Sequence, residues 1–219
     1  MEGKGAFLGL VVLGLAACSG IRAEKPATSL EPIEIRQYEG QNSSLVEDFP
    51  ENSIAGPQTI SLNSYQLKIT GMVEHPMALN YAQVLAEHHY RKVVTLHCVE
   101  EWDATILWEG ILINDLLEKA KTKPEAVMVI FHAADGYTSS LPLEFVRANK
   151  LLLAHKLNGL TLTAERGFPF EVVAESKWGY KWVRWVTEIE LSADEHYRGY
   201  WESRGFNNNG DQTGPIFEP

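Results

Sequence analysis

The residue best suited to chemistry is Cys98, which lies where an apolar run ends and an acidic cluster begins, in the segment VTLHCVEEWD. Three interpretations of this thiol are open. It can be a small buried residue at a strand end, as most free cysteines are. It can be a nucleophile whose pKa is lowered by His132 from another strand. It can be a soft metal ligand, with His97, Glu100 or His132 as further ligands. The local sequence alone favours the first.

Several other kinds of site are excluded by the sequence. The chain has no G-x-S-x-G, G-x-x-x-x-G-K-[ST], H-E-x-x-H or C-x-x-C motif, so serine-hydrolase, P-loop, zincin and thioredoxin-type chemistry lack their defining residues. The 219 residues carry a formal net charge of −10, and no Lys/Arg run is longer than two residues. A nucleic-acid-binding protein would show a basic patch instead, so we expect no nucleic-acid partner.

Residues 1–17 are expected to be a lipoprotein signal peptide. After a lysine near the start, an apolar run over 6–13 is too short to span a bilayer, and small residues then lead to Cys18. The sequence LAAC at 15–18 resembles the lipobox of bacterial lipoproteins, which implies cleavage before Cys18 and lipidation of that residue. Acyl chains there would anchor the protein to the periplasmic side of a bacterial membrane, and Ser19 favours the outer membrane.

Proline, glycine and asparagine interrupt residues 18–57, which we predict to be a tether followed by an extended arm lying on the domain. The folded domain is expected over 58–219. Apolar periodicity predicts strands at 65–73, 91–97, 104–108, 126–132, 151–155, 168–174 and 183–191, and helices at 81–87, 111–120 and 141–147. Asn80 is expected to cap the first helix, and Asn158-Gly159 to form a turn. Many short strands and few helices indicate the α+β class.

Four longer segments, together covering about residues 65–206, carry a pattern that extends beyond Cys98. They are VVTLHCVEEWDATILWEGILINDLLEKA, VIFHAADGYTSSLPLE, LLLAHKLNGLTLTAERGFPFEVVAESKWGYKWVRWVTEIEL and GYWESRGF. These segments resemble the molybdopterin-binding domain of the sulfite oxidase family. C-V-E-E-W followed by W-E-G-I-L-I-N-D-L-L is specific when joined to the later L-N-G and G-F-P. The resemblance is strongest to short stand-alone members and to the catalytic subunit of the periplasmic methionine sulfoxide reductase.

The resemblance implies a sulfite-oxidase-type fold of mixed sheets with few short helices, and an oxidoreductase. Cys98 would supply the protein thiolate on molybdenum, and the pterin dithiolene would supply the other sulfur ligands. The molybdenum-molybdopterin cofactor would then carry out oxygen-atom transfer on a small molecule or an oxidised side chain. Glu101 and Asp103 stand where relatives carry small residues. Because their charges would repel an anion, sulfite is a disfavoured substrate.

The phosphate of such a pterin requires cationic partners. Arg166, Lys177, Lys181 and Arg184 fall within nineteen residues, interleaved with aromatic residues. Arginine can bind phosphate with two parallel hydrogen bonds, and lysine as a point charge. We therefore predict cofactor binding here, chiefly by Arg166 and Lys181; the alternative is a solvated basic strand backed by aromatic core. Asn52 loosely matches an N-terminal segment that folds over the pterin in the family.

Electrons are expected to come from a separate protein, such as a cytochrome or a quinol-linked membrane subunit, because the chain lacks the haem-binding domain of animal sulfite oxidases. The first residues, MEGKG, carry no arginine pair. Exported enzymes of this family usually carry such a pair, since they leave the cytoplasm folded with the cofactor inserted. The alternative function is therefore a cofactor-free binding or interaction module that keeps the fold.

Overall fold

The structure, a computed structural model, describes residues 33–218. The predicted signal peptide, Cys18 and the first part of the tether lie outside these residues. Within the described part, no helix has both the length and the apolar character needed to cross a bilayer. The described chain begins with a two-stranded hairpin, β1 (Gln37–Tyr38) and β2 (Gln41–Asn42), and a 3-10 turn, η1 (Val46–Asp48).

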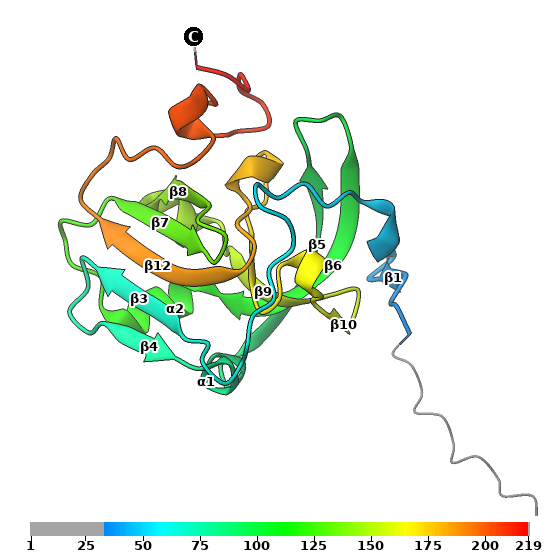
Figure 1. The fold of residues 1–219 in the computed structure, drawn as a ribbon, viewed down its shortest axis with the longest axis horizontal. Helices are drawn as coiled ribbons and strands as arrows, with labels where there is room; N and C mark the ends of the chain where they lie inside the picture. The colour runs from blue at the N-terminus through cyan, green and yellow to red at the C-terminus, as the bar shows by residue number, and fades with distance from the viewer. Residues whose placement is uncertain (1–32, 219) are drawn as a thin grey trace, which may run out of the picture. The chain divides into compact units, whose positions relative to one another are not determined.

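The first large sheet, on the right of Figure 1, is antiparallel throughout and has the order β10-β9-β6-β5, with β11 also paired to β9. Its strands are β5 (His89–His97), β6 (Asp103–Leu112), β9 (Leu152–Leu157), β10 (Leu160–Thr161) and β11 (Glu171–Val173). The turn Asn158-Gly159 joins β9 to β10 with φ angles of 47° and 82°, which confirms the predicted turn.

The second sheet has the order β4-β3-β12-β7-β8, and only the β3–β12 pair is parallel. Its strands are β3 (Leu67–Gly71), β4 (Met77–Leu79), β7 (Met128–Ala133), β8 (Thr138–Pro142) and β12 (Val186–Ser192). The predicted strands are confirmed in type, but β4 and β8 were not predicted. β8 reads TSSLP, whose polar residues are buried against other polar groups, so apolar alternation could not reveal it.

The α-helices are few and short, as predicted. They are α1 (Tyr81–Leu85), α2 (Ile113–Ala120) and α3 (Leu143–Ala148), and 3-10 turns occur at η2 (Ala164–Arg166), η3 (Gly179–Lys181) and η4 (Glu202–Arg204). Asn80 caps α1 as expected, in a reciprocal capping box with Gln83. The helix predicted at 141–147 begins at Leu143 instead, because the preceding residues pair in β8.

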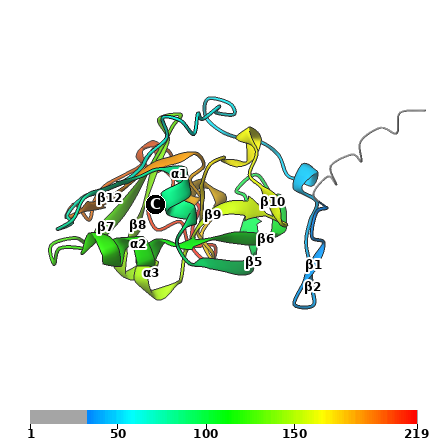
Figure 2. The ribbon, with the colours of Figure 1, turned by 90° about the horizontal axis from the view of Figure 1, so that it is seen from below.

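Both sheets contribute to one hydrophobic core. Trp108 of β6, Phe131 of β7 and Ile189 of β12 are fully buried in the same cluster, and the two sheets lie on opposite sides of the domain in Figures 1 and 2. The N-terminal arm is attached to the first sheet. The Ser44 N–H donates to the Thr105 carbonyl oxygen (2.7 Å), and the Asn158 amide donates to the Ser44 carbonyl oxygen (2.9 Å).

A β-bulge interrupts the pairing of β6 with β9. Glu109 pairs with Lys156 and Gly110 pairs with Ala154, so His155 is an extra residue with no partner on β6. The two backbones approach closely beside the bulge: a Cβ atom at Gly110 would lie 2.3 Å from the Leu153 carbonyl oxygen. A side chain therefore cannot be accommodated at Gly110 without moving β9.

We predict that Gly110→Ala lowers the free energy of unfolding by about 1–3 kcal/mol, the usual cost of overpacking. Urea denaturation of the two proteins measures this difference. Gly214→Ala is the matched control, because its nearest neighbour would be an Asp211 oxygen at an ordinary 3.5 Å. Equal stability of the two variants would contradict the close approach of β9 to β6.

Candidate active site

Cys98 lies in the tight loop that joins β5 to β6. Its N–H donates to the Trp102 carbonyl oxygen (2.9 Å), and its carbonyl oxygen accepts the Glu101 N–H (3.3 Å). Glu101 adopts a positive φ of 66°, which lets the loop close over few residues. Cys98 is only 7% exposed. The hairpin thus holds a buried thiol at its end.

This thiol lines a pocket of about 350 Å³, within the ~300–1,000 Å³ usual for small-molecule and cofactor sites. Six segments of the chain form it: the arm at 52–54, the β5–β6 loop, the β7–β8 turn at 135–137, Glu171 of β11, residues 179–185 and the C-terminal residues 201–217. Its walls are rich in aromatic side chains, namely Trp102, Tyr137, Tyr180, Trp182, Trp185, Trp201, Phe206 and Phe217. Such walls limit the contact of the thiol with water.

Two polar side chains approach the Cys98 sulfur. The Asn52 Nδ2 group lies 3.6 Å from Sγ, and the Glu100 carboxylate lies 3.9 Å from it. Burial raises the pKa of the Cys98 thiol. A hydrogen bond from the Glu100 backbone lowers this pKa, whereas the charge of the Glu100 carboxylate raises it. The hydrogen bond from Asn52 acts in the opposite direction and favours the thiolate. Asn52 and Cys98, both predicted as site residues, are 46 positions apart in the sequence and lie together in the structure.

The predicted arginines lie near each other, but only Arg184 lines the pocket. Its guanidinium contacts two carboxylates, Glu51 of the arm at 3.3 Å and Glu171 of β11 at 3.7 Å. Arg166 stacks over the Phe49 ring, with Cζ 4.0 Å from the centroid, and donates to the Pro50 carbonyl oxygen (3.4 Å). Both arginines therefore hold the arm beside the pocket.

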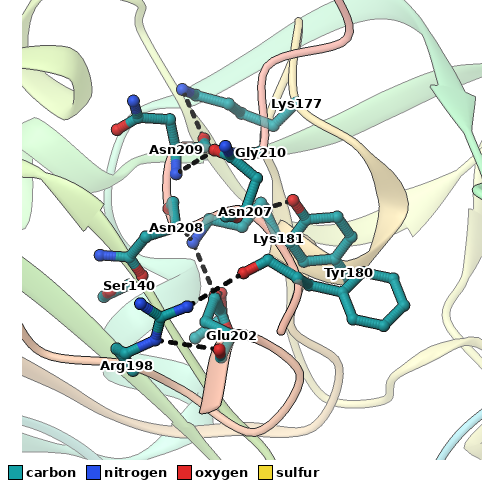
Figure 3. Close-up of polar contacts among 12 residues, drawn as sticks. Ser140, Lys177, Tyr180, Lys181, Arg198, Glu202, Asn207, Asn208, Asn209 and Gly210 are labelled. Atoms are coloured by element: carbon teal, nitrogen blue, oxygen red, sulfur yellow. Dashed lines mark hydrogen bonds and ion pairs between the residues drawn. The ribbon is translucent and has the colours of Figure 1, made fainter. Parts of the chain in front are cut away.

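The predicted lysines point to the C-terminal segment, as Figure 3 shows. Lys181 is fully buried, and its ammonium donates to Glu202 (2.6 Å) and to the Asn208 carbonyl oxygen (2.7 Å). Lys177 donates to the Asn209 carbonyl oxygen (2.8 Å) and pairs with Asp211. Neither lysine lines the pocket. They hold in place the C-terminal segment, whose aromatic residues line the pocket.

No histidine among residues 33–218 lines the pocket. His132, the partner that a nucleophilic cysteine would need, hydrogen-bonds Glu190 at 2.8 Å, and His97 faces Asp103 at 3.7 Å. The structure therefore gives no support to a Cys98–His132 pair or to histidine ligands beside the thiol.

Glu101 and Asp103, the acids expected to repel an anion, also lie outside the pocket wall. The carboxylates in the wall are Glu100, Asp135 and Glu171. Glu171 is 2% exposed and was not recognised as a site residue. The sequence offered one indication of this site residue. Glu171 is the only charged residue in the apolar run FPFEVVA, and an acid in such a run is buried together with its strand.

The chemistry of the pocket fits a sulfur-ligated metal carried by an anionic organic cofactor. Cys98 offers a soft ligand, and Arg184 offers a cation in the wall. Ser53 in the same wall has a buried hydroxyl oxygen without a hydrogen-bond partner in the described chain, which is the state expected of a group that binds a ligand.

Comparison with known proteins identifies the type of domain. Residues 54–201 match the family model described as the oxidoreductase molybdopterin binding domain. The oxidoreductase YuiH of Bacillus subtilis is 36% identical over 172 residues, which cover 78% of this chain and 86% of that protein. The methionine-sulfoxide reductase catalytic subunit MsrP of Gluconobacter oxydans is 30% identical over 61% of this chain, but this match spans only 49% of that subunit.

A solved structure shares the fold. The sulfane dehydrogenase SoxCD from Paracoccus pantotrophus superposes with a TM-score of 0.61 at 23% identity, covering 64% of this chain and 41% of that one. The sulfite-oxidase-type architecture predicted from the sequence is therefore confirmed.

We predict that Lys181→Met lowers the free energy of unfolding by about 3–5 kcal/mol, because it leaves the Glu202 carboxylate buried without its cation. Removing both charges in Lys181→Met/Glu202→Leu should restore part of that loss. Thermal and urea unfolding measure both variants. A Lys181→Met protein as stable as wild type would contradict a structural ion pair and leave Lys181 free for another role.

Because the Glu171 carboxyl is buried, we predict that the free energy of unfolding depends on pH. Burial, opposed by Arg184, raises the pKa of this carboxyl from 4.5 to about 7. Its stabilising contribution is therefore complete below pH 4.5 and is lost as the pH rises through 7. Relative to wild type, Glu171→Gln should gain about 2 kcal/mol of unfolding free energy between pH 5 and pH 8. The exposed Glu125→Gln is the control, and parallel pH profiles of Glu171→Gln and wild type would refute the assignment.

Proposed function

The chain belongs to the family of oxidoreductases with a molybdopterin-binding domain, and from this premise we propose that Cys98 binds the molybdenum of the cofactor. The observation that carries the proposal is the position of this thiol. It is the single cysteine of residues 33–218, and it lies in the wall of the pocket described above. A bound metal ion favours the thiolate and so offsets the burial that raises the thiol pKa.

The residues predicted to bind the cofactor divide into two groups by their contacts. Arg184 lies in the pocket wall, so it is the first choice for the pterin phosphate, and Asn52 approaches the sulfur ligand itself. Arg166, Lys177 and Lys181 would act by holding the arm and the C-terminal segment in place around the cofactor. A residue that does not touch the cofactor can affect cofactor binding as much as one that does, because it orients the residues in direct contact.

When bound, the cofactor supplies two-electron oxygen-atom transfer. The protein contributes a water-poor pocket, and it contributes a proton site. Reduction of an oxo substrate to the deoxygenated product and water consumes two protons. The Glu171 carboxyl, in the pocket wall with a pKa near 7, can hold one of them at neutral pH. Arg184 beside it stabilises the carboxylate left after proton transfer.

We propose a neutral oxo compound as the substrate, either a small molecule or an oxidised side chain such as a sulfoxide. The relative named as a methionine-sulfoxide reductase supports this class. The charges of the pocket support it too. Glu100 lies beside the thiol and Asp135 in the same wall, and Coulomb repulsion from both disfavours an anion such as sulfite.

We further propose that electrons reach the site from a separate cytochrome or quinol-linked membrane subunit. Lipidation at Cys18 would hold the domain at the periplasmic side of a bacterial membrane, where such partners work. The support for the anchor is the N-terminal sequence alone, an apolar run followed by LAAC. Labelling with a radioactive fatty acid tests it, with Cys18→Ser as the control.

The decisive experiment measures molybdenum and pterin per chain in protein produced by a host that makes the cofactor. We predict near-stoichiometric amounts of both in the wild type. Cys98→Ser should lose the molybdenum or change its absorption spectrum, because a hydroxyl is a poorer soft ligand than a thiolate. His196→Ala, at an exposed site, is the control and should match wild type.

The opposite result would select the alternative function. If neither molybdenum nor pterin copurifies with wild type or Cys98→Ser, the cofactor assignment is wrong for this member. The domain would then be a binding module that retains the fold, with Cys98 as a structural residue.

A further inference from the structure

A second group of ligand-type side chains lies far from the pocket. His89 begins β5, Glu109 lies in β6 and His155 lies in β9, so the three residues occupy adjacent strands of the first sheet. His89 and Cys98 are separated by the whole length of β5, about 30 Å at the usual rise of a strand. The group is therefore independent of the molybdenum site.

The β-bulge explains how three side chains from three strands meet. In regular pairing the side chain of His155 would point to the face opposite that of Lys156. The bulge places both opposite Glu109, since Glu109 pairs with Lys156 and the next pair is Gly110 with Ala154. The ligand atoms of His89, Glu109 and His155 all lie within 4.8 Å of one another. Bulges commonly redirect a side chain in this way near functional sites.

The hydrogen bonding of His89 leaves a lone pair that faces Glu109, and His155 presents an unpartnered ring nitrogen to the same carboxylate. His89 Nε2 lies 2.9 Å from the Leu85 carbonyl oxygen, which can only accept, so Nε2 carries the hydrogen and Nδ1 carries the lone pair. That Nδ1 atom lies 3.7 Å from Glu109 Oε1. His155 Nε2 lies 3.9 Å from the same oxygen, is buried and has no hydrogen-bond partner among the described residues.

These separations suit a metal ion better than a hydrogen bond. Both N···O distances are too long for hydrogen bonds, although a protonated imidazole could move closer to the carboxylate. Ligand atoms at about 2.0–2.1 Å from a tetrahedral Zn²⁺ ion lie about 3.4 Å apart. A contraction of a few tenths of an ångström would bring each nitrogen to that distance from Glu109 Oε1. The two nitrogens, which lie within 4.8 Å of each other, would also have to move closer together. His89 Nε2 hydrogen-bonds a backbone carbonyl oxygen. A hydrogen bond of this kind from the nitrogen that does not bind the metal usually orients a metal-binding histidine.

We propose that His89, Glu109 and His155 form a binding site for a divalent transition-metal ion, with Zn²⁺ as the best match. Two imidazole nitrogens and one carboxylate oxygen are ligands that Zn²⁺ takes, and three protein ligands leave a fourth position for water. His89 is the half-exposed member of the site, and the other two are buried. The ion would enter past His89.

Two cationic side chains, Arg91 and Lys156, contact Glu109 and would affect its binding of a metal ion. Arg91 Nε donates to Glu109 Oε2 at 2.6 Å and can keep this bond, because the proposed ligand is the other oxygen. Lys156 Nζ lies 3.2 Å from Glu109 Oε1 and would compete with the metal ion for this oxygen. Its side chain is 34% exposed and can turn to solvent. Burial lowers the pKa of His155 to about 4, so the imidazole is neutral and available as a ligand at neutral pH.

The test is a Zn²⁺ titration of the full-length protein after removal of metals by a chelator, in competition with a chromophoric indicator. All variants carry Cys98→Ser, so that the thiol cannot bind the ion. We expect one Zn²⁺ per chain. His89→Ala and His155→Ala should weaken binding at least about tenfold, the loss typical of even an outer partner. His196→Ala, at an exposed histidine outside the group, should leave binding unchanged.

Lys156→Met gives the sharpest test, because it should tighten Zn²⁺ binding by about tenfold through removal of a competing charge. A merely structural polar cluster would show no such gain. Zn²⁺ should also raise the unfolding temperature of the Cys98→Ser protein but not of the same protein with His89→Ala. Because the His89 side chain is 32% exposed, misfolding of that variant is a poor explanation. Absence of stoichiometric binding, or binding unaffected by His89→Ala and His155→Ala, would overturn the proposal whatever the molybdenum content.

Discussion

The buried ion pair between Lys181 and Glu202 is the constraint on which the pocket depends. Both side chains are completely buried, and a buried charge is tolerated only when it is paired and hydrogen-bonded. Ser139 and the Asn208 carbonyl oxygen supply further hydrogen bonds to the pair. Because Glu202 lies in the C-terminal segment, this requirement forces that segment across residues 179–185 and completes the aromatic wall around the thiol.

The arm on the other side of the pocket is held by a weaker and more adjustable set of charges. Arg184 divides its guanidinium between Glu51 of the arm and Glu171 of the wall, at 3.3 and 3.7 Å. Any change in the charge of Glu171 therefore changes how strongly Arg184 holds the arm. Since Asn52 adjoins Glu51 and approaches the Cys98 sulfur, protonation of Glu171 is linked electrostatically to the environment of the thiol.

The β5–β6 hairpin connects two chemically distinct ends of the domain. At one end its tight loop buries the thiol. Towards the other end, the bulge opposite Glu109 gathers two imidazoles and a carboxylate. A paired strand is a rigid spacer of fixed rise, so the two groups cannot come into contact. The two proposed metal sites, one with a soft sulfur ligand and one with nitrogen and oxygen ligands, would therefore not share an ion.

Most of the secondary-structure elements, and the position of a cysteine suited to binding a metal, could be predicted from the sequence alone. Apolar periodicity located most strands and the three α-helices of residues 33–218, since local burial patterns follow backbone period. Cys98, predicted as a site residue, lies in the wall of the pocket. Only the tertiary structure decided where charged side chains point. Lys181 and Arg184 are three residues apart, yet one pairs with Glu202 and the other lines the pocket. Such partners come from distant segments, and the free energy of a buried charge depends on them rather than on its neighbours in sequence.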